Sequence, residues 1–528
     1  MVSKLCKAAK YISDGNKHAR ARKYADAALG IVDRDELEVT IVDKRNKDLL
    51  MSYGIIPVKD EKDKLHRYEF IQKFLKESRQ FGAQRRASEK LSCEMALKNL
   101  AITAGYADSL RLVLAMETAL ISENQKFFDG LEVEGYQFKI IIPDDGKAEL
   151  SVAKEGKKLK SVPAALKKNE IVNEIKEFVT KLKDQYSRTV KMFENSMEER
   201  EEYLAGELTT LCKNSVIKTI LCKLIYVKDN EFFVISENGD FVKTLSNDDK
   251  VILESSDSIR VAHPFDMYES GHWSELQELV FSWANDGKKY QPFKQVFREL
   301  YIKLSEETEQ TSSRMFAGNQ IQPHKTVATL KNRRWIADYE NGLQKIYYKD
   351  NIIATIYAMA DWFSPSDVEE PTLEYVKFYD RKTFKEKKLS EIPNIVYSEV
   401  MRDVDLAVSV AHAGGVDPEA SHSTIELRKS IISFNLKLFK LANVRLEGTH
   451  AFIKGKYGEY SVHLGSGMIH KMSGIAVNVL PVHSQNRGKI FLPFMDEDPK
   501  TAEIMSKIIM FAEDDKIKDP QILEKILC

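Results

Sequence analysis

The stretch RRWIADYENGLQKIYYKDNIIATIYAM, residues 333–359, decides the fold class of this 528-residue chain. From Trp335 onward its apolar and polar residues alternate with a period of two, which is typical of strands with one buried face. Turn-forming residues interrupt the alternation at Glu340-Asn341-Gly342 and at Lys349-Asp350-Asn351. We therefore predict an antiparallel β-meander here, followed by one more strand in LEYVKFYD, residues 373–380.

Helical periodicity is found on both sides of this meander. Apolar residues recur at helical spacing in HWSELQELVFSWAND (272–286) and in QPFKQVFRELYIKL (291–304). They recur again from Ile395 to Val410, where they are too frequent for a fully exposed helix. We predict three helices, the last of them buried.

The first 125 residues show helical spacing almost throughout, as in Tyr68, Ile71 and Phe74, and very little strand signal. Glycines separate short helices, which suggests paired helices that stack as in HEAT or armadillo arrays. An array that starts at residue 1 needs a polar cap on its first helix. That helix instead offers an apolar stripe, which favours a longer array in the full-length protein: Leu5, Ala8, Ala9 and Ile12.

Strand and mixed patterns follow the helical segment. LEVEGYQFKIII turns through Pro143-Asp144-Asp145-Gly146 into KAELSVA, which predicts a hairpin, and a long amphipathic helix is expected from Asn169. A second hairpin is expected in NEFFVISENGDFV, residues 230–242. Near the C-terminus we expect helices at 424–441 and 501–512, with strands around THAFIKG, YSVHLG, IAVNVLP and KIFLP.

Together these patterns predict an α+β multidomain protein, in which a HEAT/armadillo-like helical segment precedes mixed α/β modules with antiparallel sheets. The predicted modules are 1–125 (helical repeat-like), 126–165 (small β-hairpin element and basic linker), 166–330 (helix-rich with a small antiparallel β unit), 331–420 (β-meander plus buried helix) and 421–528 (C-terminal α+β).

The composition excludes several classes of protein. The chain has 79 Lys and Arg against 80 Asp and Glu, so no global field attracts it to nucleic acid or to an anionic membrane. No stretch approaches the roughly 18 apolar residues that span a bilayer, and the N-terminus has no apolar signal core. Five scattered cysteines argue against a disulfide framework. We expect a cytoplasmic protein without a membrane partner.

Local basic stretches leave nucleic acid open as a partner. Residues 151–191 hold eleven Lys and Arg against five Asp and Glu, although the solvated face of a long helix explains them better. Two arginine pairs, Arg85-Arg86 and Arg333-Arg334, are candidate phosphate contacts, the second beside Trp335. Ion pairing with neighbouring acids is the interpretation that we favour for both pairs.

Familiar catalytic and cofactor motifs are missing from the sequence. It contains no GxxxxGK[ST], GxGxxG, HExxH, GxSxG or paired CxxC, so we predict no cofactor and no resident metal.

Histidines are the one feature that points to chemistry, since six of the eleven follow residue 410. In AHAGGVDPEASHST, a loop predicted between two helices, imidazoles and carboxylates come together: His412, Asp417, Glu419 and His422. Such a set suits a binding or catalytic loop, or a divalent metal. The interpretation that we favour is structural: His412 ends one helix and Ser421, Ser423 or Thr424 caps the next. His463 and Ser466 are expected nearby.

Five strings of sequence carry a resemblance to a known family: FGAQRRASEK (81–90), AGYADSLRLVLAME (104–117), VYSEVMRDVDLAVSVAHAGGVDPEASHS (396–423), KYGEYSVHLGSGMIH (456–470) and FLPFMDEDPKTAEIMSKIIMFAEDDKIKDPQI (491–522). They resemble the C-terminal part of the MolR-like bacterial family, large proteins of poorly defined function. Some members carry an N-terminal WGR domain, which implies nucleic-acid-linked regulation by analogy. The resemblance brings no catalytic residues to transfer.

We therefore expect a cytoplasmic, non-enzymatic interaction or regulatory protein, with a helical platform, protein partners and a possible association with nucleic acid. The alternative is an enzyme of uncharacterised type, such as a metal-dependent hydrolase, that uses the His412–His422 loop. The oligomeric state is left open by the sequence.

Overall fold

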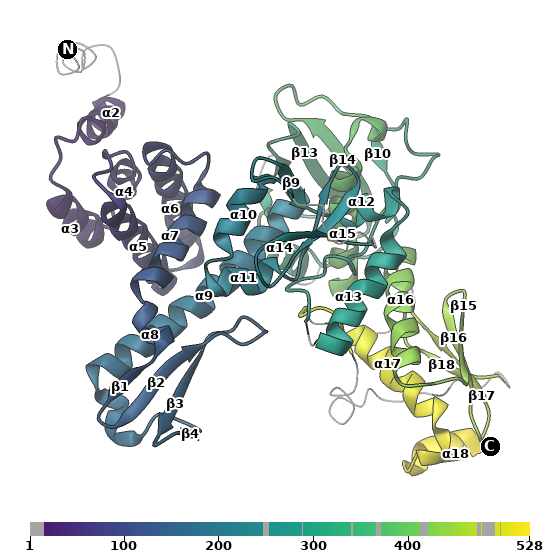
Figure 1. Ribbon diagram of the computed structural model, residues 1–528. Coiled ribbons are helices and arrows are strands. Elements are labelled where there is room, and N and C mark those ends of the chain that lie inside the picture. Colours follow the sequence, from purple (N-terminus) through teal and green to yellow (C-terminus); the bar gives the residue numbers. More distant parts are fainter. Residues whose placement is uncertain are drawn as a thin grey trace. The chain divides into compact units, whose positions relative to one another are not determined.

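The computed structural model describes residues 15–245, 253–287, 289–338, 342–365, 371–411, 421–472, 477, 491–496 and 498–527 (Figure 1). These residues hold seventeen α-helices, α2 to α18, and four antiparallel sheets, which confirms the mixed α+β class. None of these helices is long and apolar enough to cross a membrane. The chain divides into two compact units, Met1–Met192 with Glu207–Thr219 and Phe193–Gly206 with Ile220–Cys528.

The first unit begins with a helical segment, as predicted. Helix α6 packs against α4, α5 and α7, and a shared core includes the fully buried Ile41, Tyr53 and Ile71. Asp and Asn side chains accept hydrogen bonds from the first backbone N–H groups of α3, α4, α5 and α7, as N-caps commonly do. The helices are α2 Gly15–Ala28, α3 Arg34–Lys44, α4 Lys47–Tyr53, α5 Glu61–Glu77, α6 Ala83–Thr103, α7 Ser109–Glu123 and α8 Gln125–Asp129.

The predicted hairpin after this segment is part of a larger four-stranded meander. The alternation in LEVEGYQFKIII continues through a tight turn at Glu134-Gly135, so it makes two strands where we expected one. At the next turn Gly146 has φ +73°, and a Cβ there would lie 2.1 Å from Tyr186 Cε2, so only glycine fits. The elements are β1 Leu131–Val133, β2 Tyr136–Ile141, β3 Glu149–Lys154, β4 Lys157–Leu159 and the long helix α9 Glu170–Glu199.

A five-stranded sheet in the order β5-β9-β6-β7-β8 opens the second unit. It contains the predicted hairpin over Ser236–Asp240 and packs with helices α12 and α13 around a core that includes Ile225, Met267 and Val280. The elements are β5 Glu202–Leu204, β6 Ile225–Lys228, β7 Glu231–Ile235, β8 Phe241–Lys243, β9 Ser258–Val261, α12 Pro264–Glu269 and α13 Trp273–Gly287. Helices α10 Ala205–Leu211 and α11 Ser215–Leu221 lie between β5 and β6 in the chain, but most of their residues belong to the first unit.

The predicted meander forms a second five-stranded sheet, in the order β10-β14-β13-β12-β11. Its inner face packs on helix α15, whose buried residues Val400 and Val404 meet Ile356 and Phe378 in one core. The burial predicted for this helix is thus confirmed. The elements are β10 Ser312–Ser313, α14 Pro323–Lys331, β11 Trp335–Asp338, β12 Gly342–Tyr347, β13 Ile352–Ala358, β14 Leu373–Asp380 and α15 Asn394–Ala411.

The C-terminal part is a helix-flanked meander, in the strand order β15-β16-β17-β18. Helix α17 packs on β16 and β17 around a core that includes Tyr460, Ile504 and Phe511. Most of the strands expected in IAVNVLP and KIFLP lie outside the described residues. The elements are α16 His422–Leu438, β15 Val444–Glu447, β16 His450–Lys454, β17 Glu459–His463, β18 Ile469–Lys471, α17 Pro499–Ala512 and α18 Pro520–Leu527.

The helix predicted for QPFKQVFRELYIKL is wrong. Residues 291–304 form no helix, although most of them are buried. Their polar side chains bind the backbone of other segments: Gln295 donates to the carbonyls of Ile225 and Ala262 at 2.7 and 2.8 Å and accepts from the Ile225 N–H at 3.0 Å. Apolar residues recur at helical spacing because the segment is enclosed on several sides, so periodicity alone misleads here.

One residue of this segment, Arg298, is the centre of a buried ion network. Its fully buried guanidinium donates to both oxygens of Glu399 at 2.7 Å, to Glu198 at 2.8 Å and to Glu194 at 2.9 Å. The Nδ1 of His263 accepts the Phe265 N–H, so its Nε2 donates to Glu399 at 2.9 Å. Burial alone would raise the pKa of Glu399, but Arg298 and His263 outweigh it and hold that pKa well below its usual range.

Asp403 extends the network to the sheet. It accepts hydrogen bonds at 2.8 Å from Lys345 on β12 and from the Trp335 indole on β11, and it pairs with Arg333. Burial raises the pKa of Asp403, but Arg333 and Lys345 overcome this and bring it to about 2. Helix α15 is thereby tied to two strands by ionised groups away from water.

The hydrogen bonds of Gln295 give a first prediction. In Gln295→Leu the Ile225 N–H and the Ala262 carbonyl lose their hydrogen bonds to Gln295 in the interior, at about 1–3 kcal/mol each, whereas the Ile225 carbonyl still accepts the Ala262 N–H. We expect the free energy of unfolding to fall by at least about 2 kcal/mol in urea denaturation. Gln310→Leu, at an exposed glutamine of the same unit, is the control. A Gln295 variant as stable as this control would contradict the assigned role.

The low pKa of Asp403 gives a second prediction, on acid stability. Its folded-state pKa of about 2 lies below the unfolded value, about 3.9. Its contribution to stability is therefore complete above about pH 4 and is lost as the pH falls toward 2. Asp403→Asn should cost about 3–5 kcal/mol at pH 7, because Arg333 and Lys345 lose a buried partner.

Urea denaturation at several pH values tests this expectation, with Asp515→Asn at an exposed carboxylate as the control. The difference between Asp403→Asn and the wild type should shrink steadily below pH 4. A difference that stays constant down to pH 2.5 would show that Asp403 is not ionised in the folded protein.

Candidate functional site

The outer face of the sheet β10–β14 carries a hollow of about 440 Å³, which we name the aromatic groove. Strand alternation places Gln344, Thr355 and Tyr357 on this face, opposite the side chains that pack on α15. The groove runs over β12, β13 and β14, which are neighbours in the sheet. Of these strands, β13 and β14 are labelled in Figure 1. It is lined by Gly342, Gln344, Ile353, Thr355, Ile356, Tyr357, Ala358, Ala360, Trp362, Tyr375, Tyr379 and Phe384.

Two stacked tyrosines mark the groove. Tyr357 on β13 and Tyr375 on β14 are cross-strand partners, and their rings lie parallel, with centroids 4.6 Å apart and planes 5° from each other. The Tyr357 side chain is 43% exposed, so a broad aromatic surface faces solvent. Burial raises the pKa of Tyr375 above its ordinary value, so its hydroxyl stays protonated at neutral pH.

Trp362 contributes a further ring at the β12 side of the groove. The indole is 5% exposed and lies against Gly342, which has φ +71°. A Cβ at Gly342 would lie only 3.4 Å from Trp362 Cδ1, so glycine allows the close approach.

Phe384 lies at the other end, beyond Tyr379, and its backbone is unusual. It has φ +55°, a left-handed conformation that is uncommon for a bulky residue, and yet its side chain is 65% exposed. Asp380 holds the turn, because it accepts hydrogen bonds from the backbone N–H groups of Lys382 and Thr383 at 3.0 and 2.8 Å. The fold therefore keeps an aromatic ring in solvent without gaining the stability of its burial.

The chemistry of the lining is that of contact and stacking. Among the twelve residues none is an acid, a base or a cysteine, and Gln344, Thr355 and the tyrosine hydroxyls supply the polar groups. The groove can therefore hold a planar or apolar ring and hydrogen-bond its edges.

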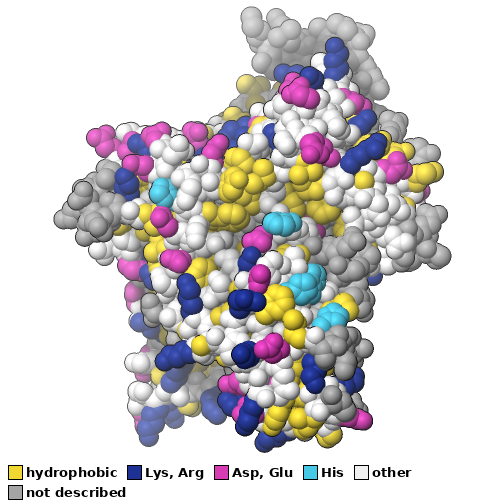
Figure 2. Space-filling model, turned by 90° about the vertical axis from the view of Figure 1, so that its right-hand side faces the viewer, with side chains coloured by type: hydrophobic (Ala, Val, Ile, Leu, Met, Phe, Trp, Pro, Cys, Tyr) yellow, Lys and Arg dark blue, Asp and Glu magenta, His cyan; other side chains and the backbone are white. Residues whose placement is uncertain are grey.

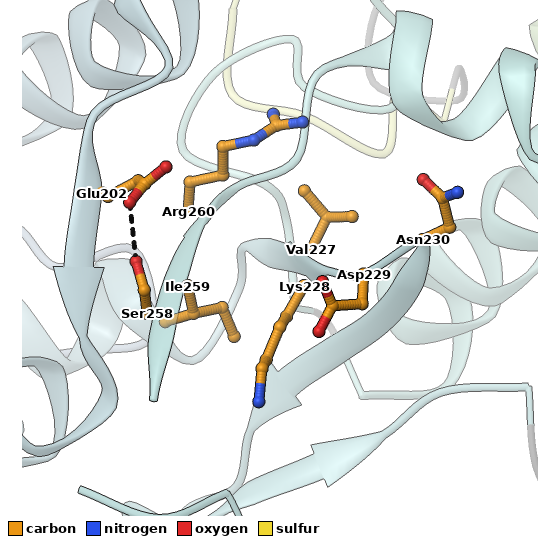
Figure 3. Close-up of a pocket in the computed structure, with 8 residues that line it drawn as sticks. All are labelled: Glu202, Val227, Lys228, Asp229, Asn230, Ser258, Ile259 and Arg260. Atoms are coloured by element: carbon orange, nitrogen blue, oxygen red, sulfur yellow. Dashed lines mark hydrogen bonds between the residues drawn. The ribbon is translucent and has the colours of Figure 1, made fainter. Parts of the chain in front are cut away.

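A second hollow, of about 330 Å³, lies on the sheet β5–β9 and has a different lining (Figure 3). Charged groups of both signs surround it, and three of the four, Glu202, Lys228 and Arg260, form hydrogen bonds with residues of the fold. Arg260 donates to both oxygens of Asp266 at 2.6 and 2.7 Å, and Lys228 donates to Asp257 at 2.7 Å. Ser258 donates to Glu202 at 2.8 Å across the strands, the dashed line in Figure 3. Since most of these charges already have partners in the fold, this hollow is a weaker candidate for a functional site than the aromatic groove.

The histidine loop predicted from the sequence lies mostly outside the described residues, which include none of His412, Asp417 and Glu419. His422 is the first residue of α16, and Ser421 caps this helix by accepting the Thr424 N–H at 3.2 Å. Within the described residues, no three His, Cys, Asp or Glu side chains form a group that could hold a metal ion.

His463 and Ser466 do lie together, in the turn between β17 and β18. The Nδ1 of His463 lies 3.0 Å from Ser466 Oγ and accepts the backbone N–H of Ser466 at 3.1 Å. Ser466 Oγ in turn accepts the Met468 N–H. Because both groups take part in the backbone turn, this pair fits a structural turn better than a nucleophile and its base.

The four candidate arginines are divided between the two units. In the second unit, Arg333 pairs with Asp403, and Arg334 donates to Glu198 at 2.8 Å. In the first unit, Arg85 donates to Glu89 at 3.0 Å and lies over the Phe81 ring at 3.8 Å, whereas Arg86 is exposed. Arg85, Arg333 and Arg334 thus form ion pairs with acidic side chains, as the ion-pairing interpretation of the sequence expected. The partner of Arg85 lies one helical turn away, and those of Arg333 and Arg334 lie far along the chain.

The aromatic groove was missed at the level of sequence. Its signal was present, because Tyr357 follows Ile353 and Thr355 at a spacing of two, and Tyr375 and Tyr379 share the corresponding face of LEYVKFYD. Aromatic residues on the polar side of an alternating strand indicate a binding surface as much as charged residues do. What the sequence does not contain is the register that brings Tyr357 opposite Tyr375.

Charge on the molecular surface is mixed. On the face shown in Figure 2, Lys and Arg side chains lie among Asp and Glu, and hydrophobic side chains gather in separate patches. This agrees with the near-zero net charge. Attraction of a charged partner must therefore come from a local cluster.

Three segments of the chain match models of domains whose function is unknown. Residues 3–116 match a family of unknown function (DUF5724), residues 156–335 a domain of unknown function (DUF4132) and residues 425–526 a domain of unknown function (DUF7737). No curated protein and no solved structure matches the chain. The MolR-like assignment made from the sequence is wrong, because none of the three matching models is a MolR-like family.

Proposed function

We propose that this chain is a non-enzymatic binding protein, and that its partner stacks a planar ring on the aromatic groove. The observation that carries the proposal is the parallel pair of Tyr357 and Tyr375 on the outer face of the sheet. The solvent-facing side of an antiparallel sheet is ordinarily polar, so the exposed rings of Tyr357 and Phe384 need a reason other than stability of the fold.

The energetics of ring contacts support this proposal. A ring that stacks on an exposed aromatic side chain gains contact area and a favourable ring geometry, about 0.5–1.5 kcal/mol beyond burial. Phe384 supports it independently, because its left-handed backbone is maintained by the Asp380 turn while its side chain stays in solvent. Backbone strain of this kind is often found at ligand contacts.

Binding is favoured over catalysis by the lining of the groove. General acid or base catalysis needs a titratable group within hydrogen-bond reach of the substrate, and nucleophilic catalysis needs an activated side chain. The lining offers tyrosine hydroxyls, Thr355 and Gln344. These groups can orient a partner through hydrogen bonds.

The groove also has a firm support, as binding sites need. Lys345 lies on β12 directly beside Gln344 of the groove, and its ammonium is held by Asp403 on the inner face. The ion network beneath the sheet thus holds β11 and β12, and β12 pairs directly with β13, from which Tyr357 projects.

The proposal keeps two expectations from the sequence: a cytoplasmic location, and a platform of paired helices, as in HEAT or armadillo arrays, for protein partners. The thiol of Cys93 supports the first, since it is buried and forms no disulfide, as in a reducing compartment. Burial raises the pKa of Cys93 to about 12.

Saturation-transfer difference NMR with three small probes, namely adenosine, indole and methyl β-glucopyranoside, tests the proposed function. We expect the planar probes to receive saturation from the wild-type protein and to lose most of it in Tyr357→Leu/Tyr375→Leu, which removes the rings but keeps apolar side chains. Tyr457→Leu, at an exposed tyrosine of the C-terminal part, should behave as the wild type. Equal saturation in all three proteins, or none in any, would refute a ring-binding groove.

A further inference from the structure

A basic turn lies at one end of the aromatic groove. Residues 381–388, RKTFKEKK, carry five Lys and Arg and one Glu, and Phe384 of the groove lies among them. The turn follows β14 directly, so it is built on the same strand as Tyr375 and Tyr379. This is a local cluster of the kind that a chain of near-zero net charge needs to attract an anion.

The carboxylates next to this cluster are already engaged. Asp380 accepts hydrogen bonds from the turn itself and from Asn351 Nδ2 at 2.6 Å. Glu386 pairs with Lys377 at 2.5 Å and accepts from Thr311 at 2.8 Å. The negative charge of the turn is therefore bound to neighbouring donors.

Three of the five cations already have a partner in the fold. Lys388 pairs with Glu309 at 2.8 Å, Lys387 lies 3.9 Å from Glu391, and the Arg381 guanidinium lies 5.3 Å from the centroid of the Tyr348 ring. Lys382 and Lys385 are exposed, and neither forms an ion pair with a residue in the part of the chain that the structure describes. Two ammonium groups thus flank an exposed ring, which is the combination that a stacked base and its phosphates require.

The dimensions of the groove set the length of the partner. Tyr375 and Tyr379 are four residues apart on β14, about 13 Å at 3.3 Å per residue. Aromatic residues on the face of a four-stranded sheet can stack about two or three bases. A duplex does not suit such a face, because its bases are already stacked on each other inside the helix.

We propose that the partner is a single-stranded nucleic acid, whose bases stack on Tyr357, Tyr375 and Phe384 and whose phosphates meet Lys382 and Lys385. This inference rests on the proposed function, since it names the class of partner for the same groove. The stacking rings set the affinity per base, and the two lysines set the dependence on salt.

Fluorescence anisotropy with labelled 12-nucleotide probes tests the inference: oligo-U, oligo-dT and a 12-base-pair DNA duplex. We expect both single strands to bind the full chain more tightly than the duplex, and comparison of oligo-U with oligo-dT separates RNA from DNA as the source of the ligand. Tyr357→Leu/Tyr375→Leu should weaken binding at least about fivefold, since a stacked base contributes about 1 kcal/mol or more. Tyr457→Leu should leave the affinity unchanged.

Salt titration tests the lysines. The slope of log K against log salt falls by about 0.7 for each phosphate contact of a single strand. Lys382→Gln/Lys385→Gln should therefore reduce the slope by about 1.4. Lys157→Gln/Lys158→Gln removes the same charge from exposed positions on β4, within the other basic stretch, and should change neither slope nor affinity.

Two outcomes would overturn the inference: single strands that bind no better than the duplex, or equal salt slopes for the two lysine variants. If adenosine or indole still contacts the groove in the NMR experiment, only the class of partner is wrong. If no ring probe binds there, the proposed function fails together with it.

Discussion

Charge balance around Arg298 is the constraint on which the rest of the second unit depends. An arginine with no access to water requires carboxylates in fixed positions, and those carboxylates in turn need every cation around them. The partners come from the end of α9, from α15, from β11 and from β12. Removal of one group leaves an uncompensated charge in the interior, so the network has a single acceptable arrangement and fixes the elements that supply it.

The sheet above the network benefits from this arrangement. Its inner face is secured by an ammonium and an indole bound to Asp403, as well as by apolar packing on α15. The identity of the outer side chains then matters little for folding, which leaves this face available for recognition. In the function that we propose, the stacked pair of Tyr357 and Tyr375 uses that freedom. The division between an inner, packed face and an outer, solvent-facing one follows from the strand period of two.

Regular periodicity was the part of the fold that the sequence predicted well. The spacing of apolar residues was enough to predict the strands of the meander and helix α15. The strands bury one face, and the helix is buried along most of its length. Periodicity gave a wrong prediction for residues 291–304, because the side chains of Gln295 and Arg298 form hydrogen bonds with different segments of the chain. Hydrogen bonds to distant backbone groups leave no periodic trace in a sequence.

The sequence shows which residues could form the candidate site, but it does not show which of them lie together. Tyr357 and Tyr375 are visible in the sequence, but their register depends on how β13 pairs with β14. Arg333 and Arg334 illustrate the reverse problem. They had the composition of a phosphate site, and only the fold brings Asp403 and Glu198 to them. Charge alone does not distinguish a binding site from an internal ion pair until the partners are known.

The buried segment 291–304 also has a consequence for synthesis on the ribosome. Lys294 is bound by Asp496 through its backbone N–H and by Asp498 through its ammonium, partners 202 and 204 residues later in the chain. At about 5–20 residues per second, roughly 10–40 s pass before those aspartates emerge. During that interval the apolar residues of the segment lack part of their enclosure. The nascent chain therefore exposes part of this apolar segment for that time, and slower translation lengthens the exposure.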